Sequence, residues 1–360
     1  MMDTINYMGS KKKLLVFLEK SFSLYEIDSF FDAFSGSTRV AYHFRDKYNV
    51  IVNDKLSFSK VIADALMLNK KPAKFYQPYI DELNVLKGEM GWFSKNYGGY
   101  ENDGLAIVND FPNRRAIWMI DNANRIDAIR NKIENYTELS IVEKNVLLYC
   151  LIMAIKRVSN TLGHQNGYLK NWAKNCYKEL QLVIPNLETN NKIHETYCED
   201  IYHLLPLIKT DMIYFDPPYG TMNKNLKVAT RYASFYHLWN TLILNHQPEL
   251  FGKAGKPTST KGWTPKIEKN DTEIVKDEFK KLIRLSNSRY VSFSYSNQGL
   301  LTKQEFYDIF KECGIDDIDF YEESHQVNNQ TNHAKKEGLF INYGREKEAL
   351  KEYLFVGKRW

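Results

Sequence analysis

The sequence has 360 residues, of which 43% are apolar and 26% are charged, and its formal net charge is +5. This is the ordinary composition of a globular protein that is long enough for a full core and a second, smaller domain. The mild basicity is compatible with nucleic-acid binding without requiring it, and the absence of a run of about 18 apolar residues excludes a membrane-spanning helix.

The first predicted elements are two short apolar runs, residues 27–34 and 48–54, which read as strands that each end at an acid or a turn. Between them, residues 37–48 have helical spacing, with Val40, Ala41, Phe44 and Tyr48 on one face. Strand, helix and strand in this order indicate a βαβ unit of a parallel sheet. Residues 58–69 then continue as a helix.

The middle of the chain, from about residue 71 to residue 187, has a mostly helical pattern in place of the strand–helix alternation that precedes it. Residues 77–90, 113–136 and 140–160 are helical by period, and Ser140 with Glu143 forms a capping-box pattern at the start of the third helix. The segment Tyr-Gly-Gly-Tyr-Glu-Asn-Asp-Gly at 97–104 is expected to be a loop. The region is therefore predicted to be a mostly helical insertion.

Strand-like and helix-like segments alternate again after the insertion. The expected strands are residues 193–198, 212–216, 290–295 and 317–323, and the expected helices are residues 200–208, 231–245, 272–286 and 302–313. Thr302 and Glu305 form a second capping box. Residues 338–344 and 350–358 suggest a terminal antiparallel pair. These segments predict a doubly wound α/β core interrupted by a helical region.

The four cysteines, Cys150, Cys176, Cys198 and Cys313, are not arranged as C-x-x-C or with zinc-site spacing, so no metal site is expected. We expect buried free thiols in a reducing compartment. The N-terminal residues lack the apolar core of a signal peptide, which predicts a cytoplasmic location.

The most informative motif is Asp216-Pro217-Pro218-Tyr219, which directly follows a predicted buried strand. Ligands of an open parallel sheet bind beyond the carboxyl ends of its strands, so Asp216 is expected in the site. The two prolines fix the backbone and leave their carbonyls free to accept hydrogen bonds. A carboxylate, a rigid carbonyl and an aromatic face together suit a planar ring that carries an exocyclic amine.

Other motifs are weak evidence for a function individually and become stronger evidence through their order along the chain. Asp32 precedes a small-residue turn, Ser35 to Thr38, in which Gly36 allows close approach of a carboxylate-bearing or phosphate-bearing cofactor. Asp54 ends the next strand and can accept from ribose hydroxyls; Asp200 follows a later strand. In isolation, Asp54 reads better as a helix N-cap, and Asp200 can also be read as one. The run that begins with Gly9, Ser10 and Lys11 would by itself be interpreted as a solvated lysine segment.

In this order the motifs resemble the D12 class (alpha group) of DNA N6-adenine methyltransferases of the restriction-modification type. "YMGSK" is similar to motif X, "DAFSGST" to motif I, Asp54 to motif II, "CEDI" to motif III and "DPPYG" to motif IV. The resemblance implies a Rossmann-like mixed sheet, the class I S-adenosylmethionine-dependent methyltransferase fold. Residues 1–70 and 188–360 are then the catalytic core, and 71–187 the helical target recognition insertion.

The resemblance also assigns roles to residues of this chain. S-adenosylmethionine is the implied methyl donor, and its binding residues are expected to be Tyr7, Lys11, Asp32, Phe34, Gly36, Ser37, Asp54, Asp200 and Asp216. The catalytic residues are expected to be Asp216, Pro217, Pro218 and Tyr219: Asp216 and the Pro217 carbonyl accept from the amino group of a flipped adenine, and Tyr219 stacks on the base. Thr38 stands where the family has a second glycine, so its side chain either crowds the cofactor or turns outward.

Double-stranded DNA is the expected partner, and basic side chains are candidates to neutralise its phosphates. They are Arg114, Arg115, Lys156, Arg157, His164, Lys170, Lys253 and Lys256. The resemblance further implies a bacterial or phage-encoded protein, expected to be a monomer, with a cognate restriction endonuclease acting separately.

Three alternatives stay open at this stage. In the first two, the methylated group is the N4 amine of cytosine, or belongs to a base in RNA; Asp216 favours adenine over these. In the third, the chain keeps the fold as a DNA-binding module without catalysis. A nicotinamide dehydrogenase is disfavoured because no G-x-G-x-x-G follows a strand.

Overall fold

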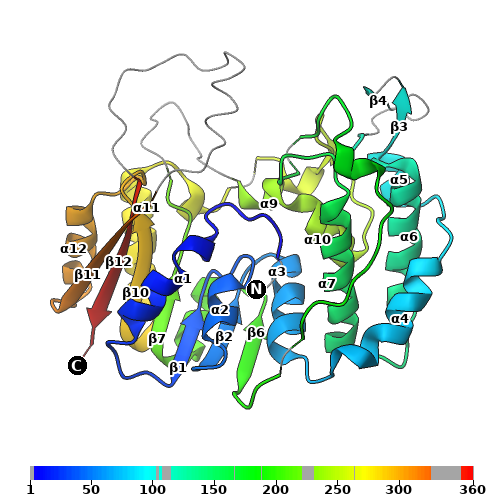
Figure 1. The fold of residues 1–360 in the computed structure, drawn as a ribbon. Helices are drawn as coiled ribbons and strands as arrows, with labels where there is room; N and C mark the ends of the chain where they lie inside the picture. The colour runs from blue at the N-terminus through cyan, green and yellow to red at the C-terminus, as the bar shows by residue number, and fades with distance from the viewer. Residues whose placement is uncertain are drawn as a thin grey trace. The chain divides into compact units, whose positions relative to one another are not determined.

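The computed structural model of the chain describes residues 4–102, 105–107, 115–165, 167–187, 189–220, 231–262, 264–325 and 350–359 (Figure 1). The chain forms two compact units, each built from segments that are distant in sequence. The first unit comprises Met1–Leu15, Asp28–Leu204 and Arg231–Thr264, and the second comprises Val16–Ile27, Leu205–Thr230 and Pro265–Trp360.

The first unit contains three parallel strands. Strand β2 (Asn49–Asn53) pairs with β1 (Ser29–Asp32) on one side and with β6 (His194–Tyr197) on the other. Helix α2 (Arg39–Phe44) connects β1 to β2, so the predicted βαβ unit is confirmed. Its buried face is the predicted one, Val40, Ala41 and Phe44.

Helices make up most of the rest of the first unit, and they share one hydrophobic core. In Figure 1, α6 and α7 run side by side. The core joins Phe58 and Ile62 of α3, Leu147 and Leu151 of α7, and Leu242 of α10. The helical region after residue 71 therefore packs on helices that flank it in sequence. The helices are α3 (Ser57–Ala63), which continues as a π-helical turn η2 (Asp64–Leu68), α4 (Ala73–Val85), α5 (Trp92–Tyr97), α6 (Ile120–Glu134), α7 (Ile141–Arg157), α8 (Ile201–Leu204), α9 (Tyr232–Phe235) and α10 (His237–Leu244), with 3₁₀ turns η1 (Lys11–Lys13), η3 (Lys174–Tyr177) and η5 (Thr258–Thr260).

The start of α7 is fixed by the predicted capping box. The Ser140 hydroxyl accepts from the Glu143 N–H (3.3 Å), and the Glu143 carboxylate accepts from the Ser140 N–H (2.8 Å). Two N–H groups that the helix leaves without an intrahelical partner are thereby satisfied. The second predicted capping box, Thr302 with Glu305, likewise begins α12.

The predicted loop at 97–104 is wrong over its described part, because residues 98–102 form strand β3 (Gly98–Asn102). This strand pairs antiparallel with β4 (Leu105–Ile107) and parallel with β5 (Trp118–Met119). Turn-forming residues hid the strand because ladder hydrogen bonds outweigh local propensity. Strand β5 also delays the start of α6 to Ile120. Strands β8 (Leu250–Phe251) and β9 (Lys256–Pro257) form a further short antiparallel pair.

The second unit is a mixed sheet with helices. Strand β10 (Asn287–Ser296) pairs parallel with β7 (Lys209–Phe215) and antiparallel with β12 (Leu350–Lys358), which also pairs antiparallel with β11 (Ile318–His325). The terminal strand was predicted, but its predicted partner at 338–344 lies outside the described residues. The helices are α1 (Leu15–Phe22), α11 (Thr272–Leu285) and α12 (Lys303–Glu312), with 3₁₀ turns η4 (Leu205–Leu207) and η6 (Lys266–Glu268).

The mixed α/β architecture predicted from the sequence is confirmed, with strands and helices alternating along the chain. Of the cysteines, Cys150 and Cys176 are buried as expected, whereas Cys198 and Cys313 are only half-buried. Among the helices that the structure describes, none combines the length and the apolar character needed to span a lipid bilayer.

A buried carboxylate holds the helical region together at the start of α5. Asp127 of α6 accepts hydrogen bonds from the N–H groups of Gly91 (3.1 Å), Phe93 (3.0 Å) and Ser94 (2.8 Å). It is 5% exposed, and burial raises its pKa while these hydrogen bonds oppose the rise. A Cβ on Gly91 would lie 2.5 Å from the Asp127 Cγ atom, so the contact needs glycine there.

We expect Asp127→Ala to lower the free energy of unfolding by about 3 kcal/mol or more, because each buried donor left unpaired costs about 1–3 kcal/mol. Urea unfolding measures the change. Asp81→Ala removes an exposed carboxylate of α4 and should change stability by no more than about 0.5 kcal/mol. Equal losses in the two variants would contradict the capping role of Asp127.

Candidate active site

The turn after β1 is shaped by a contact with the N-terminal segment. Gly36 has φ +51°, and a Cβ at this position would lie 2.5 Å from Cε1 of Tyr7. Tyr7 is itself stacked on Tyr236, with ring centroids 4.7 Å apart. The Thr4 hydroxyl donates to the Ser37 carbonyl (3.2 Å). Residues of the motif X and motif I segments therefore lie in contact.

Thr38 stands at the position where a second glycine was expected. Its backbone adopts the left-handed conformation that glycine would favour, with φ 61° and ψ 16°. Its side chain turns inward, because the residue is completely buried. The hydroxyls of Thr38 and Ser35 are buried without a hydrogen-bond partner among the described residues. A β-branched residue in this conformation is rare and costs energy, and such strain and unpaired groups are concentrated at binding sites.

Asp54 joins the ends of the two neighbouring strands. One carboxylate oxygen accepts from the Gly36 N–H (2.9 Å), and the other accepts from the Leu56 N–H (2.9 Å). Burial raises the pKa of Asp54 to about 6, although these hydrogen bonds oppose the rise. Asp32, which is 1% exposed, accepts from the Ala41 N–H of α2 (3.1 Å). Both acids thus hold backbone of the turn region in place.

Asp200 stands at the end of β6 and is paired. Its carboxylate accepts from the Lys55 ammonium (2.6 Å) and from the Tyr202 N–H (3.1 Å). Burial opposes ionisation, but these hydrogen bonds and the Lys55 charge hold the pKa of Asp200 below its usual value. Asp200 also begins α8, because its carbonyl accepts from the N–H groups of His203 and Leu204. The N-cap interpretation of Asp200 therefore coexists with a charged side chain beside Lys55.

The remaining predicted cofactor residues of the first unit differ in exposure. Phe34 is half-buried in the motif I turn. Lys11 is 4% exposed, and its ammonium group donates to the Gly9 carbonyl (3.0 Å). The structure thus brings Tyr7, Gly36 and Asp54 together in one cluster, and Asp200 joins it through the residue that follows Asp54.

The Asp-Pro-Pro-Tyr motif lies in the second unit, directly after β7. The Tyr219 hydroxyl donates to Asp216 Oδ1 (2.9 Å) and lies 3.3 Å from Glu352 Oε2. Burial raises the pKa of Tyr219 well above its usual value, and the charges of Asp216 and Glu352 add to the rise. The phenol therefore stays protonated and able to donate. Pro217 is buried, and Asp216, Pro218 and Tyr219 are half-buried.

Two residues that support Tyr219 were missed in the sequence. The Tyr295 hydroxyl donates to the Tyr219 carbonyl (2.5 Å), and its ring centroid lies 4.7 Å from that of Tyr219. Glu352 reaches the same phenol from β12. Both lie on predicted strands, but strand periodicity indicates only which face a residue shares, and it gives no signal of a contact across the sheet with a loop.

The predicted DNA-binding residues that the structure describes differ in how far their side chains are exposed. Arg157, Lys170 and Lys253 are exposed, and Lys156, His164 and Lys256 are half-buried. Arg115 is 5% exposed and donates to the Gly252 carbonyl (2.8 Å), so it holds the turn that carries Lys253. Arg114 lies outside the described residues.

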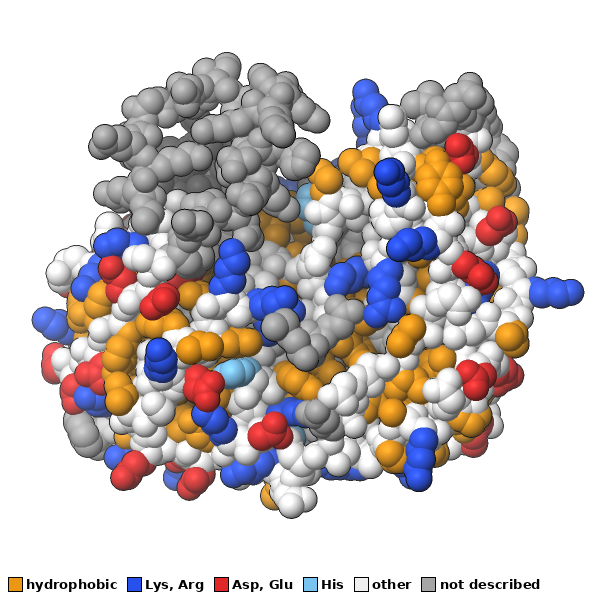
Figure 2. Space-filling view, in the orientation of Figure 1, with side chains coloured by type: hydrophobic (Ala, Val, Ile, Leu, Met, Phe, Trp, Pro, Cys, Tyr) orange, Lys and Arg blue, Asp and Glu red, His pale blue; other side chains and the backbone are white. Residues whose placement is uncertain are grey.

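Lysine and arginine side chains gather near α7 in Figure 2. Burial lowers the pKa of His164 and that of Lys256. No cluster of three or more His, Cys, Asp or Glu side chains in the described ranges has the arrangement of a metal site.

The tight contact at Gly36 can be tested by its stability. We expect Gly36→Ala to lower the free energy of unfolding by about 1–3 kcal/mol, because the left-handed backbone disfavours a Cβ and the new methyl group would collide with Tyr7. Gly167→Ala is the matched control, since a Cβ there meets no atom within 4 Å. Thermal and urea unfolding measure both. A Gly36 variant as stable as the Gly167 variant would contradict the contact.

Comparison with known proteins connects this geometry to a family. The model of the family described as D12 class N6 adenine-specific DNA methyltransferase matches residues 7–309. The modification methylase LlaI of Lactococcus lactis subsp. lactis is 28% identical over 347 residues, which cover 93% of this chain and 53% of that protein. The type II methyltransferase M.FokI of Planomicrobium okeanokoites is 29% identical over 327 residues, 86% of this chain and 47% of that protein.

The chain therefore spans about half the length of these two relatives. A third, the type II methyltransferase M.NlaIII of Neisseria lactamica, is 28% identical over 87% of this chain and 90% of its own length. The family match includes Tyr7, the turn around Gly36, Asp54, Asp200 and the Asp216–Tyr219 motif. The chain belongs to the D12 class of N6 adenine-specific DNA methyltransferases.

Proposed function

We propose that the chain transfers a methyl group from S-adenosylmethionine to the N6 amino group of an adenine flipped out of duplex DNA, as the modification enzyme of a restriction-modification system. The observation that carries the proposal is the Asp216–Tyr219 motif, in which the tyrosine hydroxyl fixes the carboxylate that would accept from the adenine amine. The names of the relatives, which are modification methylases and type II methyltransferases, support it.

The residues of the first unit fit S-adenosylmethionine. Tyr7 packs so closely on Gly36 that a Cβ would collide with its ring, and the buried hydroxyls of Ser35 and Thr38 beside this turn have no partner among the described residues. We assign the methionine end to Asp32, Phe34, Gly36 and Ser37, the ribose to Asp54 and the adenine amine to Asp200, with Tyr7 and Lys11 beside them. When bound, S-adenosylmethionine supplies an electrophilic methyl group on a sulfonium centre.

The residues of the second unit would hold the base. Asp216 and the Pro217 carbonyl accept from the two amino hydrogens, which favours a pyramidal nitrogen whose lone pair is available. An ionised carboxylate has about four acceptor sites, so Asp216 can accept from the Tyr219 hydroxyl and from the base at once. Stacking on Tyr219 contributes about 1–3 kcal/mol, which offsets the few kcal/mol that base flipping costs. Orienting the two reactants lowers the barrier by up to about 7–11 kcal/mol.

The exposed basic residues would contact the DNA backbone. The exposed side chains of Arg157, Lys170 and Lys253 are suited to phosphate contacts. The half-buried Lys156, His164 and Lys256 would contact only DNA groups that lie directly against the protein surface. We assign target recognition to residues 71–187. Affinity for DNA is then expected to fall steeply with salt. A cytoplasmic monomer, with a separate cognate endonuclease, completes the proposal.

We expect Asp216→Ala to lower kcat by at least about 10²- to 10³-fold, the loss typical of removing one preorganised polar contact to a reacting group, with little change in the Kd for S-adenosylmethionine. Transfer of labelled methyl groups to plasmid DNA, followed by digestion to nucleosides, gives both rate and product. Asp308→Ala, an exposed acid of α12, is the matched control. N4-methylcytosine as the product, or parallel losses of cofactor binding and activity in Asp216→Ala, would count against the assignment.

A second expectation concerns pH. Burial raises the pKa of Asp54 to about 6, and only its ionised form accepts from two ribose hydroxyls. The affinity for S-adenosylmethionine should therefore fall about tenfold between pH 7 and pH 5, because the carboxylate becomes protonated over this range. Folding stability depends on pH in the opposite direction. Because the pKa of Asp54 is higher in the folded than in the unfolded state, the folded state binds this proton more tightly. The contribution of Asp54 to the free energy of unfolding therefore decreases as the pH rises from about 4 to about 6.

Isothermal titration with S-adenosylmethionine at several pH values checks the Asp54 prediction, with circular dichroism to verify folding at each pH. Asp54→Asn should bind weakly and show a flat profile over the same range. A wild-type affinity that is constant from pH 5 to pH 7 would refute the assigned contact to the ribose.

A further inference from the structure

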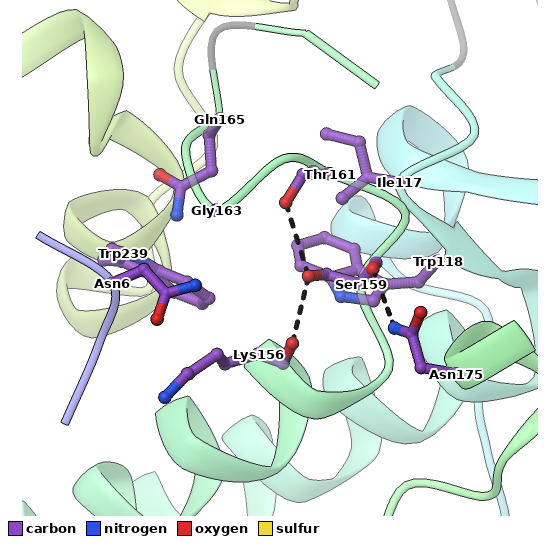
Figure 3. Close-up of a pocket in the computed structure, with 10 residues that line it drawn as sticks. All are labelled: Asn6, Ile117, Trp118, Lys156, Ser159, Thr161, Gly163, Gln165, Asn175 and Trp239. Atoms are coloured by element: carbon purple, nitrogen blue, oxygen red, sulfur yellow. Dashed lines mark hydrogen bonds between the residues drawn. The ribbon is translucent and has the colours of Figure 1, made fainter. Parts of the chain in front are cut away.

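A polar cavity of about 110 Å³ lies within the first unit, apart from the residues assigned above to the cofactor (Figure 3). Its walls come from five places in the sequence: Asn6, the β5 segment, the end of α7 with the loop that follows it, η3, and α10. A cavity of this size is much larger than the roughly 10–15 Å³ that one water needs, and somewhat smaller than the roughly 150 Å³ of a cavity that holds benzene. It therefore has room for the edge of a planar ring. It is lined by Asn6, Ile117, Trp118, Lys156, Ser159, Thr161, Gly163, Gln165, Asn175 and Trp239.

Gln165 gives the cavity its chemical character. The residue is 3% exposed, and its side-chain oxygen accepts from the Leu238 N–H (3.1 Å). This hydrogen bond fixes the amide so that its nitrogen points into the cavity (Figure 3). The amide nitrogen has no hydrogen-bond partner in the part of the chain that the structure describes. Because this N–H₂ group faces the cavity without a protein partner, Gln165 is suited to a ligand that accepts.

The other open groups of the wall include further donors. The Asn6 amide and the Trp239 indole N–H make no hydrogen bond to the described residues, and Lys156 adds a positive charge while its ammonium donates to the Thr4 carbonyl (2.5 Å). The Ser159 hydroxyl donates to the Lys156 carbonyl (3.1 Å), and its oxygen remains able to accept. The wall therefore offers several donors together with the acceptor oxygens of Asn6, Ser159 and Thr161.

The cavity is held in shape by the loop that carries Gln165. Gly163 has φ +95°, and a Cβ at this position would lie 3.0 Å from Asn6 Nδ2. The Gln165 N–H donates to the Phe235 carbonyl (2.9 Å), and the Gln165 carbonyl lies 3.2 Å from His237 Nε2. The loop is thus fixed to the Asn6 segment and to the start of α10, so that the donors are arranged before a ligand arrives.

We propose that this cavity, the Gln165 pocket, receives the edge of a guanine in the DNA site and makes Gln165 a specificity-determining residue. Guanine presents two adjacent acceptors, N7 and O6, whereas adenine pairs an acceptor with a donor, cytosine presents a donor, and thymine presents one acceptor beside a methyl group. Because the Leu238 N–H holds the Gln165 oxygen, the amide presents its N–H₂ group to the cavity, which favours the two acceptors of guanine. The walls of Trp118 and Trp239 suit a ring better than a phosphate. The inference rests on the proposed action on duplex DNA.

Gln165→Glu tests this with little change of shape. The glutamate keeps an oxygen for the Leu238 N–H and replaces the donor group by a second acceptor. We expect wild-type protein to enrich duplexes with guanine at one fixed position from a randomised pool. In Gln165→Glu this preference should fall by about one to two orders of magnitude and move toward cytosine, whose amino group donates. Gln181→Glu, an exposed residue of the same unit, makes the same change of charge and should keep the guanine.

Two results would overturn the pocket assignment. One is an unchanged guanine preference in Gln165→Glu, which would leave Gln165 as a structural clamp only. The other is weaker binding to all sequences with a smaller salt dependence, which would indicate a phosphate contact. Should Gln165→Glu fail to fold in a thermal melt, Asn6→Asp, which changes an exposed residue, carries the same expectation.

Methyl transfer is measured separately on the wild-type protein. If the protein selects guanine-containing duplexes but transfers no methyl group to them, the proposed function fails and the pocket assignment stands. If methyl transfer occurs without any guanine preference, the pocket assignment fails and the proposed function stands.

Discussion

The hydrogen bond from the Gly36 N–H to the Asp54 carboxylate is the interaction on which the turn after β1 depends. It joins the ends of two adjacent parallel strands at 2.9 Å and leaves the carboxylate with acceptor sites to spare. The same glycine leaves the space that Tyr7 occupies. Gly36 therefore brings the segments that carry Tyr7 and Asp54 into contact with the turn that follows β1.

Strain and burial accompany this arrangement. Thr38 holds a left-handed backbone without glycine, and its hydroxyl and that of Ser35 are buried without partners among the described residues. In the second unit, Tyr219 is fixed by Asp216, Glu352 and Tyr295. Both sets of residues follow one principle: side chains that the proposed function assigns to a ligand are positioned by neighbouring backbone and side chains, so that less ordering is required when a ligand binds.

The sequence allowed the α/β class, the βαβ unit, both capping boxes and the buried face of α2 to be predicted, because periodicity and local capping chemistry decide them. It did not reveal β3, where ladder pairing overrides the turn-forming residues Gly98 and Gly99. Contacts across the fold were also invisible: Glu352 reaches Tyr219 over 133 positions of sequence. The burial of Arg115 could not be predicted from its charge, since the carbonyls that accept from it lie on a distant turn.

The common core of the first unit bears on whether its helical region can be exchanged between relatives. Phe58 and Ile62 of α3 pack in the same cluster as the helices that follow residue 71 and as Leu242 of α10. Transplanting the helical region from a relative would therefore disturb close packing on several sides and not merely at two junctions. Divergence in such an architecture is expected to proceed through substitutions in surface loops, with the helices that carry them retained.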